Sequence, residues 1–215
     1  MAIKIGEITN MKLQVAFDDI TLEKLFATLE LAHNDIDIIE YGTLSVIRYG
    51  LEPLKKMRQL YPNETLLIDP KIMDAPTKIA DDCFKAGADI VTVMSVSGVE
   101  TCQKVLDVAK KYNKQVMVDL LGDFDLFTKA KQLDELGFDY LCVHSSKNEN
   151  KAPLDDFIKL KSIVKNSLLT IAGGVNLDNI ESIVKENPDN IIVGSAIYNS
   201  NNPKEIINKF KGYMK

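Results

Sequence analysis

Residues 65–74 read TLLIDPKIMD, and the organisation of the whole chain is clearest from this segment. Thr65–Ile68 is a short, mostly apolar run, which is typical of a β-strand buried on both faces. Asp74-Ala75-Pro76 then provides a cap and a proline at an early helical position, and Lys85-Ala86-Gly87 ends the amphipathic run that follows. The segment therefore predicts one β-strand that leads directly into an α-helix.

The same strand-then-helix pattern recurs on both sides of this segment. The predicted strands are Leu13–Phe17, Ile36–Tyr41, Thr65–Ile68, Ile90–Met94, Gln115–Val118, Tyr140–Val143, Leu168–Ile171 and Asn190–Val193. Amphipathic runs lie between them; one begins at Thr21, one covers Ser45 to Leu60, one ends at Gly137, two open at Pro153 and Pro203, and Asn176 caps another. Eight such units with short connections predict an α/β fold, a (β/α)8 barrel whose parallel sheet closes on itself. An open doubly wound sheet is the alternative.

Length and composition favour one globular domain. The 215 residues suit a single (β/α)8-barrel domain over residues 1–215, with residues 1–10 as an N-terminal cover or tail. Hydrophobic residues make up 46% of the chain, and the net charge of −5 comes without any basic block, so a nucleic-acid partner has little support. No apolar stretch approaches the roughly 18 residues of a membrane span, and no signal-peptide core is present.

The three cysteines bear on the cellular compartment. Cys83, Cys102 and Cys142 form no CxxC pair and are odd in number. This usage indicates reduced thiols, and we expect a cytoplasmic protein.

Polar residues follow the predicted strands, at the end where such barrels build their active sites. They are Asp18-Asp19, Glu40, Asp69 with Lys71, Ser95, Asp119, His144, Gly173-Gly174 and Gly194-Ser195. Capping of the next helix is an alternative role for Asp18, Ser95 and Asp119. Taken together, the set predicts carboxylates, a lysine and a histidine around one mouth.

Glu40 and Asp69 are candidate ligands for Mg²⁺. Glu40 ends the apolar run Ile36–Ile39, where a carboxylate is costly to bury unless it is paired or binds a cation. Two carboxylates suit Mg²⁺, which keeps waters for a substrate to replace. An ion pair between Glu40 and Lys71 is the alternative. Asp69 and Lys71 are two residues apart, so an extended backbone points both side chains the same way, while Asp74 is also a candidate N-cap.

The remaining rim positions favour proton transfer and phosphate binding. His144 closes a predicted strand and can move protons near neutral pH, with a structural histidine as the alternative. Gly173-Gly174 and Gly194-Ser195 follow the last two strands, where barrels often hold phosphate on backbone N–H groups.

The motif Asp69-Pro70-Lys71-Ile72-Met73-Asp74 resembles the Asp-x-Lys-x-x-Asp signature of the orotidine-monophosphate-decarboxylase-like superfamily. Within it the chain resembles the family of 3-hexulose-6-phosphate synthases and 3-keto-L-gulonate-6-phosphate decarboxylases. The likeness runs from Met11–Asp18 through Asp37–Thr43 and Lys71–Ala75 to Ala172–Val175, almost to the C-terminus. It implies an enzyme, a lyase of the barrel class named above.

The resemblance assigns roles to individual residues. It implies that Glu40 and Asp69 bind Mg²⁺, that Lys71 and Asp74 contact the substrate or order the site, and that His144 is the acid/base. It also implies that Asp18 binds substrate hydroxyls and that Gly173, Gly174, Gly194 and Ser195 hold a phosphate. It further implies a homodimer with the active site at the interface, where the residue matching Asp74 reaches the partner's site.

Three positions resemble the synthases rather than the decarboxylases. The decarboxylases carry Glu, Thr and Arg where this chain has Asp119, Ala172 and Ser195. The chain departs from the synthase pattern after His144, where it reads Ser145-Ser146-Lys147-Asn148, and Lys147 stands where the decarboxylases carry an Arg that contacts an intermediate. Pro70 and Pro76 are further departures.

The reaction that the resemblance implies is a Mg²⁺-assisted aldol condensation of D-ribulose 5-phosphate with formaldehyde through a 1,2-enediolate. Decarboxylation of 3-keto-L-gulonate 6-phosphate passes through the same enediolate and is the alternative. A barrel that binds a sugar phosphate without catalysis is a third possibility, which the altered segment after His144 keeps open.

Overall fold

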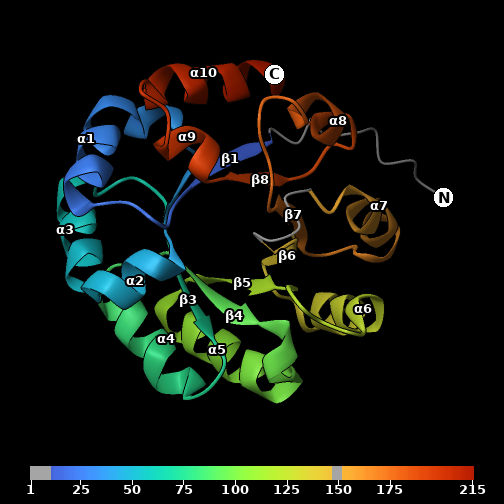
Figure 1. Cartoon of the computed structure of the whole chain (residues 1–215). Coiled ribbons are helices and arrows are strands. Elements are labelled where there is room, and N and C mark those ends of the chain that lie inside the picture. The colour runs from blue at the N-terminus through green and yellow to red at the C-terminus, as the bar shows by residue number, and fades with distance from the viewer. Residues whose placement is uncertain (1–10, 147–151) are drawn as a thin grey trace.

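The computed structural model describes residues 11–146 and 152–215, and it confirms the predicted (β/α)8 barrel. Eight parallel strands close in sequence order, and the last pairs with the first through Lys12 and Asn190 (Figure 1). They are β1 Lys12–Phe17, β2 Ile38–Tyr41, β3 Leu66–Ile72, β4 Ile90–Met94, β5 Gln115–Asp119, β6 Tyr140–His144, β7 Leu168–Ala172 and β8 Asn190–Val193. The expected cover or tail over residues 1–10 lies outside the described ranges.

Helices surround the barrel on its outside (Figure 1). They are α1 Leu22–Ala32, α2 Thr43–Tyr49, α3 Glu52–Leu60, α4 Pro76–Lys85, α5 Val99–Tyr112, α6 Leu126–Leu136, α7 Leu154–Ile163, α8 Ile180–Lys185, α9 Ser195–Tyr198 and α10 Pro203–Tyr213. Short 3₁₀ turns cover His33–Asp35 and Ser95–Ser97. Within the described ranges, no helix has both the length and the apolar character needed to cross a bilayer.

Three of the predicted helix boundaries are wrong. The single helix expected from Ser45 to Leu60 is two helices, because Gly50 adopts a φ of +65° between α2 and α3. Asp74 does not cap α4. The cap is Ala75 at φ +47°, and Asp74 Oδ1 instead accepts the Ala75 N–H at 2.7 Å. Asn176 likewise stands before the cap of α8, where its side chain closes a turn by accepting the N–H groups of Asp178 and Asn179.

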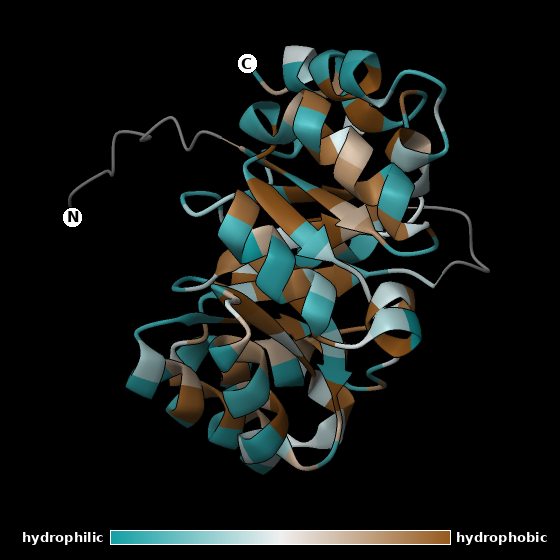
Figure 2. Ribbon diagram, turned by 90° about the vertical axis from the view of Figure 1, so that its left-hand side faces the viewer, coloured by the Kyte–Doolittle hydropathy of each residue, from teal (hydrophilic) through white to brown (hydrophobic). Residues whose placement is uncertain are grey.

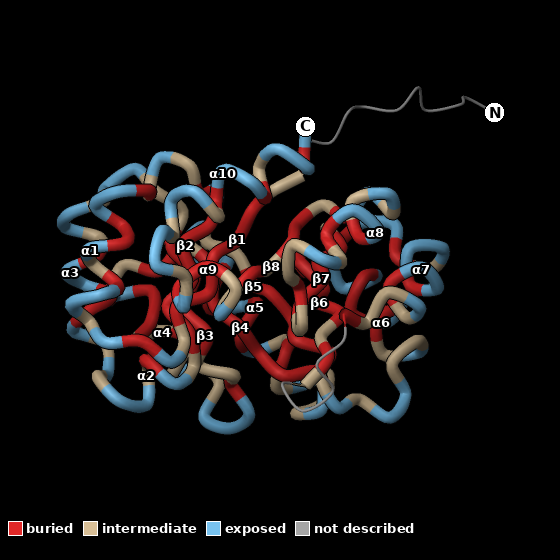
Figure 3. The backbone as a smooth tube through the Cα atoms, turned by 45° about the horizontal axis from the view of Figure 1, so that its top comes forward, coloured by how far each residue is buried: buried red, intermediate tan, exposed pale blue. Residues whose placement is uncertain are grey.

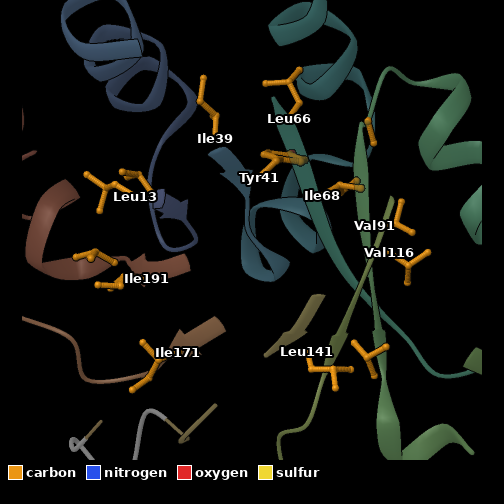
Figure 4. Close-up of a cluster of buried hydrophobic side chains, with 14 of the residues drawn as sticks. Leu13, Ile39, Tyr41, Leu66, Ile68, Val91, Val116, Leu141, Ile171 and Ile191 are labelled. Atoms are coloured by element: carbon orange, nitrogen blue, oxygen red, sulfur yellow. The ribbon is translucent and has the colours of Figure 1, made fainter. Parts of the chain in front are cut away.

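The strands bury both faces, as their composition predicts. Alternate residues such as Leu13, Ile39 and Val91 point outward into the layer between strands and helices (Figure 4). The strands are mostly hydrophobic, whereas the helices combine hydrophobic and hydrophilic residues (Figure 2). The smaller interior layer contains Ile38, Leu67, Ile90, Met117, Tyr140, Cys142 and Ala172. Buried residues line the barrel and exposed ones lie on the surrounding helices (Figure 3).

Four aspartates tie the barrel together at the amino-terminal ends of the strands. Asp37, Asp89, Asp139 and Asp189 each directly precede an even-numbered strand. Each carboxylate accepts a backbone N–H from the start of the preceding odd-numbered strand, at Leu13 (2.7 Å), Leu66 (2.9 Å), Val116 (2.9 Å) and Leu169 (2.7 Å) respectively. Because this end is the one that supports stability in such barrels, the opposite end is left for the site.

Candidate active site

A cavity of about 580 Å³ opens at the carboxyl ends of the strands. Ten of the twelve residues predicted for the site line it: Asp18, Glu40, Asp69, Lys71, Asp119, His144, Gly173, Gly174, Gly194 and Ser195. Asp74 is exposed and does not line this cavity. Lys147 lies outside the described residues. The sequence therefore predicted most of the charged and glycine residues that line this cavity.

Glu40 is a buried carboxylate on the inner face of the barrel. It is only 5% exposed, and its Oε2 accepts a hydrogen bond from Gln14 Nε2 at 2.6 Å. Burial raises the pKa of Glu40 well above its usual range, and the nearby carboxylates of Asp69 and Asp18 raise it further. The ion pair with Lys71, considered as an alternative, is not formed among the described residues, because Lys71 pairs with other carboxylates.

Asp69 is held by two hydroxyl groups. Thr43 Oγ1 donates to its Oδ2 at 2.7 Å, and Thr92 Oγ1 donates to its Oδ1 at 2.5 Å. Lys71 Nζ lies 3.1 Å from Oδ2. These contacts fix the orientation of the Asp69 carboxylate beside Glu40.

Lys71 and His144 meet on one carboxylate. Asp119 Oδ2 accepts from Lys71 Nζ at 2.6 Å and lies 2.9 Å from His144 Nδ1. Burial by itself would raise the pKa of Asp119, but the hydrogen bond and charge of His144 and the charge of Lys71 bring it below its usual range. Asp69, Lys71 and Asp119 thus alternate in charge across the mouth, and His144 stands at the end of this row.

The same row keeps Lys71 protonated. Burial would lower the pKa of the Lys71 ammonium, but the charges of Asp69 and Asp119 outweigh that effect and hold the pKa above its usual range. Lys71 is therefore a fixed cation at neutral pH, suited to hydrogen-bond donation rather than to proton abstraction.

The backbone at Lys71 is strained. The predicted extended segment is wrong in detail, because Lys71 has a φ of +46° and the pairing of β3 with β4 shifts between Ile68 and Ile72. A non-glycine residue in this region costs free energy and persists where the surroundings enforce it. Thr92 supplies part of that enforcement, since its Oγ1 accepts the Lys71 N–H at 3.2 Å. The bulge still directs both Asp69 and Lys71 into the mouth, as predicted.

The two glycine loops form the other side of the mouth. Gly173 and Gly174 have φ values of +91° and +61°, which favour glycine. A Cβ on Gly173 would lie 2.4 Å from both the carbonyl oxygen and the Oγ of Ser145, so the loop after β7 packs directly against the segment that follows His144. Gly194 stands as the cap of α9, which begins at Ser195. Such loops let backbone N–H groups approach an anion.

Sequence reasoning missed the residues that support the carboxylates. Gln14 and Thr92 are polar residues inside the runs Leu13–Phe17 and Ile90–Met94. Gln14 is fully buried and Thr92 is 4% exposed, and each donates to a site carboxylate. The available signal was a single polar residue at an inward position of an apolar strand.

The donor set fits a hard cation that keeps part of its water shell. Among the described residues no group of three or more Asp, Glu, His or Cys side chains is arranged to hold a metal ion. Glu40 and Asp69 instead provide two carboxylates, which is the number that Mg²⁺ usually takes from a protein. Burial, followed by the nearby carboxylates of Asp69 and Asp18, raises the pKa of Glu40, and a divalent cation would compensate the negative charge of this buried group.

Comparisons with known proteins identify the family of the chain. Residues 11–210 match the model of the orotidine 5'-phosphate decarboxylase / HUMPS family. The 3-hexulose-6-phosphate synthase of Staphylococcus haemolyticus is 37% identical over 198 residues, which cover 91% of this chain and 94% of that protein.

Solved structures give the same picture. The crystal structure of 3-hexulose-6-phosphate synthase from Salmonella typhimurium superposes with a TM-score of 0.91 at 35% identity, over 95% of this chain and 98% of that one. The crystal structure of KGPDC from Streptococcus mutans has a TM-score of 0.84 over 95% of this chain and 97% of that one, but at 24% identity it supports the fold alone.

Proposed function

The chain belongs to the orotidine 5'-phosphate decarboxylase / HUMPS family and is a lyase, and from this premise we propose that it is a Mg²⁺-dependent enzyme of the 3-hexulose-6-phosphate synthase type. It condenses D-ribulose 5-phosphate with formaldehyde. The observation that carries the proposal is the row of interacting side chains Asp69–Lys71–Asp119–His144, which lies beside Glu40 in one cavity.

His144 is suited to move the proton at C1 of the sugar. Its Nδ1 faces the Asp119 carboxylate, which can only accept, so the neutral ring carries its proton on Nδ1 and leaves Nε2 as the base. Nε2 takes the C1 proton, and the resulting enediolate attacks the carbon of formaldehyde. The aldehyde oxygen then receives a proton, which completes the formation of 3-hexulose 6-phosphate.

The residues that act on the negative charge developing on the sugar oxygens in this step are Lys71 and the two carboxylates Glu40 and Asp69. Glu40 and Asp69 are the residues that would hold Mg²⁺, and the ion would supply Lewis-acid stabilisation of the sugar oxygens. The Lys71 ammonium lies against Asp69 and Asp119 and can donate to an anionic oxygen in the same mouth. Gly173, Gly174, Gly194 and Ser195 would anchor the phosphate away from the reacting carbon, so that binding energy orients the substrate.

The synthase reaction is favoured over decarboxylation by three pocket positions. Asp119, Ala172 and Ser195, at which the chain departs from the decarboxylase pattern, all line the cavity. They therefore stand where the two substrates would be told apart. The site is otherwise suited to either reaction, because both pass through the same enediolate.

A homodimer is part of the proposal. Four large apolar side chains are exposed on successive loops and helices at the site end of the barrel: Ile47 (76%), Met73 (51%), Val96 (42%) and Phe124 (105%). Asp74 lies beside Met73, exposed and outside the cavity of its own chain. A second copy that covers this surface would place Asp74 toward the partner's mouth.

The three cysteines are free and buried, and the cytoplasm remains the compartment that we expect.

The test is turnover with defined substrates. D-Ribulose 5-phosphate and formaldehyde should react in the presence of Mg²⁺ and fail to react with excess EDTA. Asp69→Ala should abolish the metal-dependent rate, and a variant that stays fast and Mg²⁺-dependent would exclude the proposed ligands. Equal or faster turnover of 3-keto-L-gulonate 6-phosphate would assign the chain to the decarboxylases instead.

A further inference from the structure

Two buried amide side chains stand in line behind Glu40. Asn190 Nδ2 on β8 donates to Gln14 Oε1 on β1 at 2.7 Å, and Gln14 Nε2 donates to Glu40 Oε2 on β2 at 2.6 Å. Gln14 and Asn190 are both 0% exposed. The three strands are neighbours in the barrel (Figure 1), so the contacts form one continuous line across its inner face.

The strand register explains why the three side chains meet. Gln14 pairs with Ile38 on β2 and with Ile192 on β8. Glu40 lies two residues after the first of these partners, and Asn190 lies two residues before the second. Because side chains alternate along a strand, residues two apart share a face, and all three point into the barrel.

The line has one polarity when Glu40 is ionised, which is the form in which a carboxylate binds a cation. An ionised carboxylate only accepts hydrogen bonds, so Gln14 must turn its NH₂ group toward Glu40. Its carbonyl oxygen then faces Asn190, which must in turn present its own NH₂ group. A reversed Gln14 would set its carbonyl oxygen against the Glu40 carboxylate, and Asn190 disfavours that reversal by offering a donor.

From this geometry we propose that Gln14, oriented by Asn190, is a positioning residue that aims Glu40 at the cation. It occupies Oε2 of Glu40 and leaves Oε1 for the metal. The inference rests on the proposed function, in which Glu40 is a Mg²⁺ ligand. It adds two buried residues, Gln14 and Asn190, that act on the metal site through Glu40. Gln14 borders the cavity but is 0% exposed, and its amide group is bonded to Glu40 and Asn190, so it acts through Glu40.

The composition of the line supports a role beyond packing. Asn190 Oδ1 is buried and has no hydrogen-bond partner among the described residues. An apolar residue would avoid that desolvation, and isolated buried polar atoms call for an explanation. Orientation of the Gln14 amide supplies one, since it needs only the NH₂ group of Asn190.

The experiment measures metal binding directly, with Mn²⁺ as the probe. Gln14→Met keeps a similar volume but removes the donor. Titration of Mn²⁺ followed by electron paramagnetic resonance should give a Kd about 10- to 100-fold weaker than that of the wild type, the range for residues that orient metal ligands. The concentration of Mg²⁺ needed for half-maximal activity should rise by the same factor. Tyr140→Phe is the matched control, because it removes another hydrogen bond of the barrel interior, the partly buried one from Lys12 Nζ to the Tyr140 hydroxyl at the start of β1 and β6.

A double variant separates positioning from support of the fold. Asn190→Leu alone should weaken Mn²⁺ binding, but by less than Gln14→Met. Adding Asn190→Leu to Gln14→Met should raise the melting temperature again, because it removes a buried amide that has lost its acceptor Gln14 Oε1 and keeps only a 3.5 Å contact with Thr170 Oγ1, while the Mn²⁺ affinity stays low. A merely structural role would make stability and affinity move together.

Each outcome decides one question. If the wild type binds Mn²⁺ and Gln14→Met binds it with the same Kd, the positioning role is wrong and the proposed function stands. If the wild type binds no Mn²⁺ and turns over in EDTA, the metal-dependent function itself is wrong. Weaker binding in Gln14→Met with unchanged binding in Tyr140→Phe supports both.

Discussion

Lys71 Nζ lies 2.6 Å from Asp119 Oδ2, the same oxygen that His144 Nδ1 approaches at 2.9 Å. One buried carboxylate oxygen therefore joins the fixed cation of the site to its proton-transfer group. Asp119 accepts a third hydrogen bond on its other oxygen, from the Leu121 N–H at 3.0 Å. The side chain is held from both ends, so its replacement should disturb chemistry more than substrate binding.

Asp119→Asn should lower kcat by about a hundredfold or more, with a smaller change in KM. An asparagine has one oxygen and one NH₂ group at this position. If the oxygen accepts from Lys71 and His144, the NH₂ group faces the Leu121 N–H; if the amide is turned round, the NH₂ group faces Lys71 and His144. His144 then loses the partner that keeps its proton on Nδ1. Steady-state kinetics would measure the effect, with Asp125→Asn on the exposed following loop as the control. A kcat within twofold of the wild type would contradict the role given to Asp119.

The pH dependence of stability should reflect the same carboxylate. The pKa of Asp119 is below its usual range in the folded protein, so its ionised form stabilises the fold at every pH above the unfolded value of about 4. This contribution is lost as the pH falls below that value toward the folded pKa. The difference in melting temperature between wild type and Asp119→Asn should be largest near pH 7 and should shrink in acid. A difference that grows as the pH falls would contradict the assigned direction.

The sequence sufficed for the barrel because its strands are apolar on both faces, a pattern that survives without knowledge of tertiary contacts. It also predicted that Glu40, Asp69 and His144 lie at one mouth, where the structure has them, since the carboxyl ends of parallel strands converge. It could not give the φ of +46° at Lys71, because that conformation is imposed by the register shift with β4 and by Thr92.

Other features needed three-dimensional contacts for their interpretation. Gln14 reads as an irregularity in an apolar run until β1, β2 and β8 are placed side by side. The break at Gly50 could not be predicted, because the amphipathic spacing continues on both sides of the glycine and is compatible with one long helix. Asp74 has the sequence of a cap, yet the left-handed Ala75 after it moves the start of α4 by one residue.

Glu40→Gln should stabilise the metal-free protein at neutral pH. The pKa of Glu40 is raised in the folded protein, so the ionised form of its carboxyl group destabilises the fold. That penalty is absent at a pH below the pKa of Glu40 in the unfolded chain, because the group is then protonated in both states. In EDTA the variant should therefore melt above the wild type at pH 7, and the gap should close near pH 4. Thermal denaturation at both pH values tests this, with the exposed Glu135→Gln as a control for the loss of one charge. The same variant should lose its thermal response to Mg²⁺.

Asp139→Ala should reduce stability without affecting the chemistry. Asp139 Oδ2 accepts the Val116 N–H at 2.9 Å at the amino-terminal end of the barrel, and its loss leaves that buried group without a partner. The expected cost is about 1–3 kcal/mol of unfolding free energy, measured by urea denaturation. At a temperature where the variant stays folded, kcat should be unchanged, because the site lies at the other end of the strands. A fall in kcat with no loss of stability would contradict this division between the two ends.

Gly173→Ala and Gly98→Ala form a matched pair for the role of the loop after β7. The two glycines have nearly the same φ, +91° and +93°, a region in which an alanine is strained at either position. A Cβ at Gly98 meets nothing within 4 Å, whereas one at Gly173 lies 2.4 Å from the carbonyl oxygen and from the Oγ of Ser145. Both variants should lose stability, and the excess loss in Gly173→Ala measures the contact. Since Ser145 follows His144 directly, the displaced segment should also raise KM for D-ribulose 5-phosphate, on the order of tenfold, whereas Gly98→Ala leaves KM unchanged. Equal KM values in the two variants would mean that the packing of Gly173 against Ser145 does not shape the sugar-phosphate site.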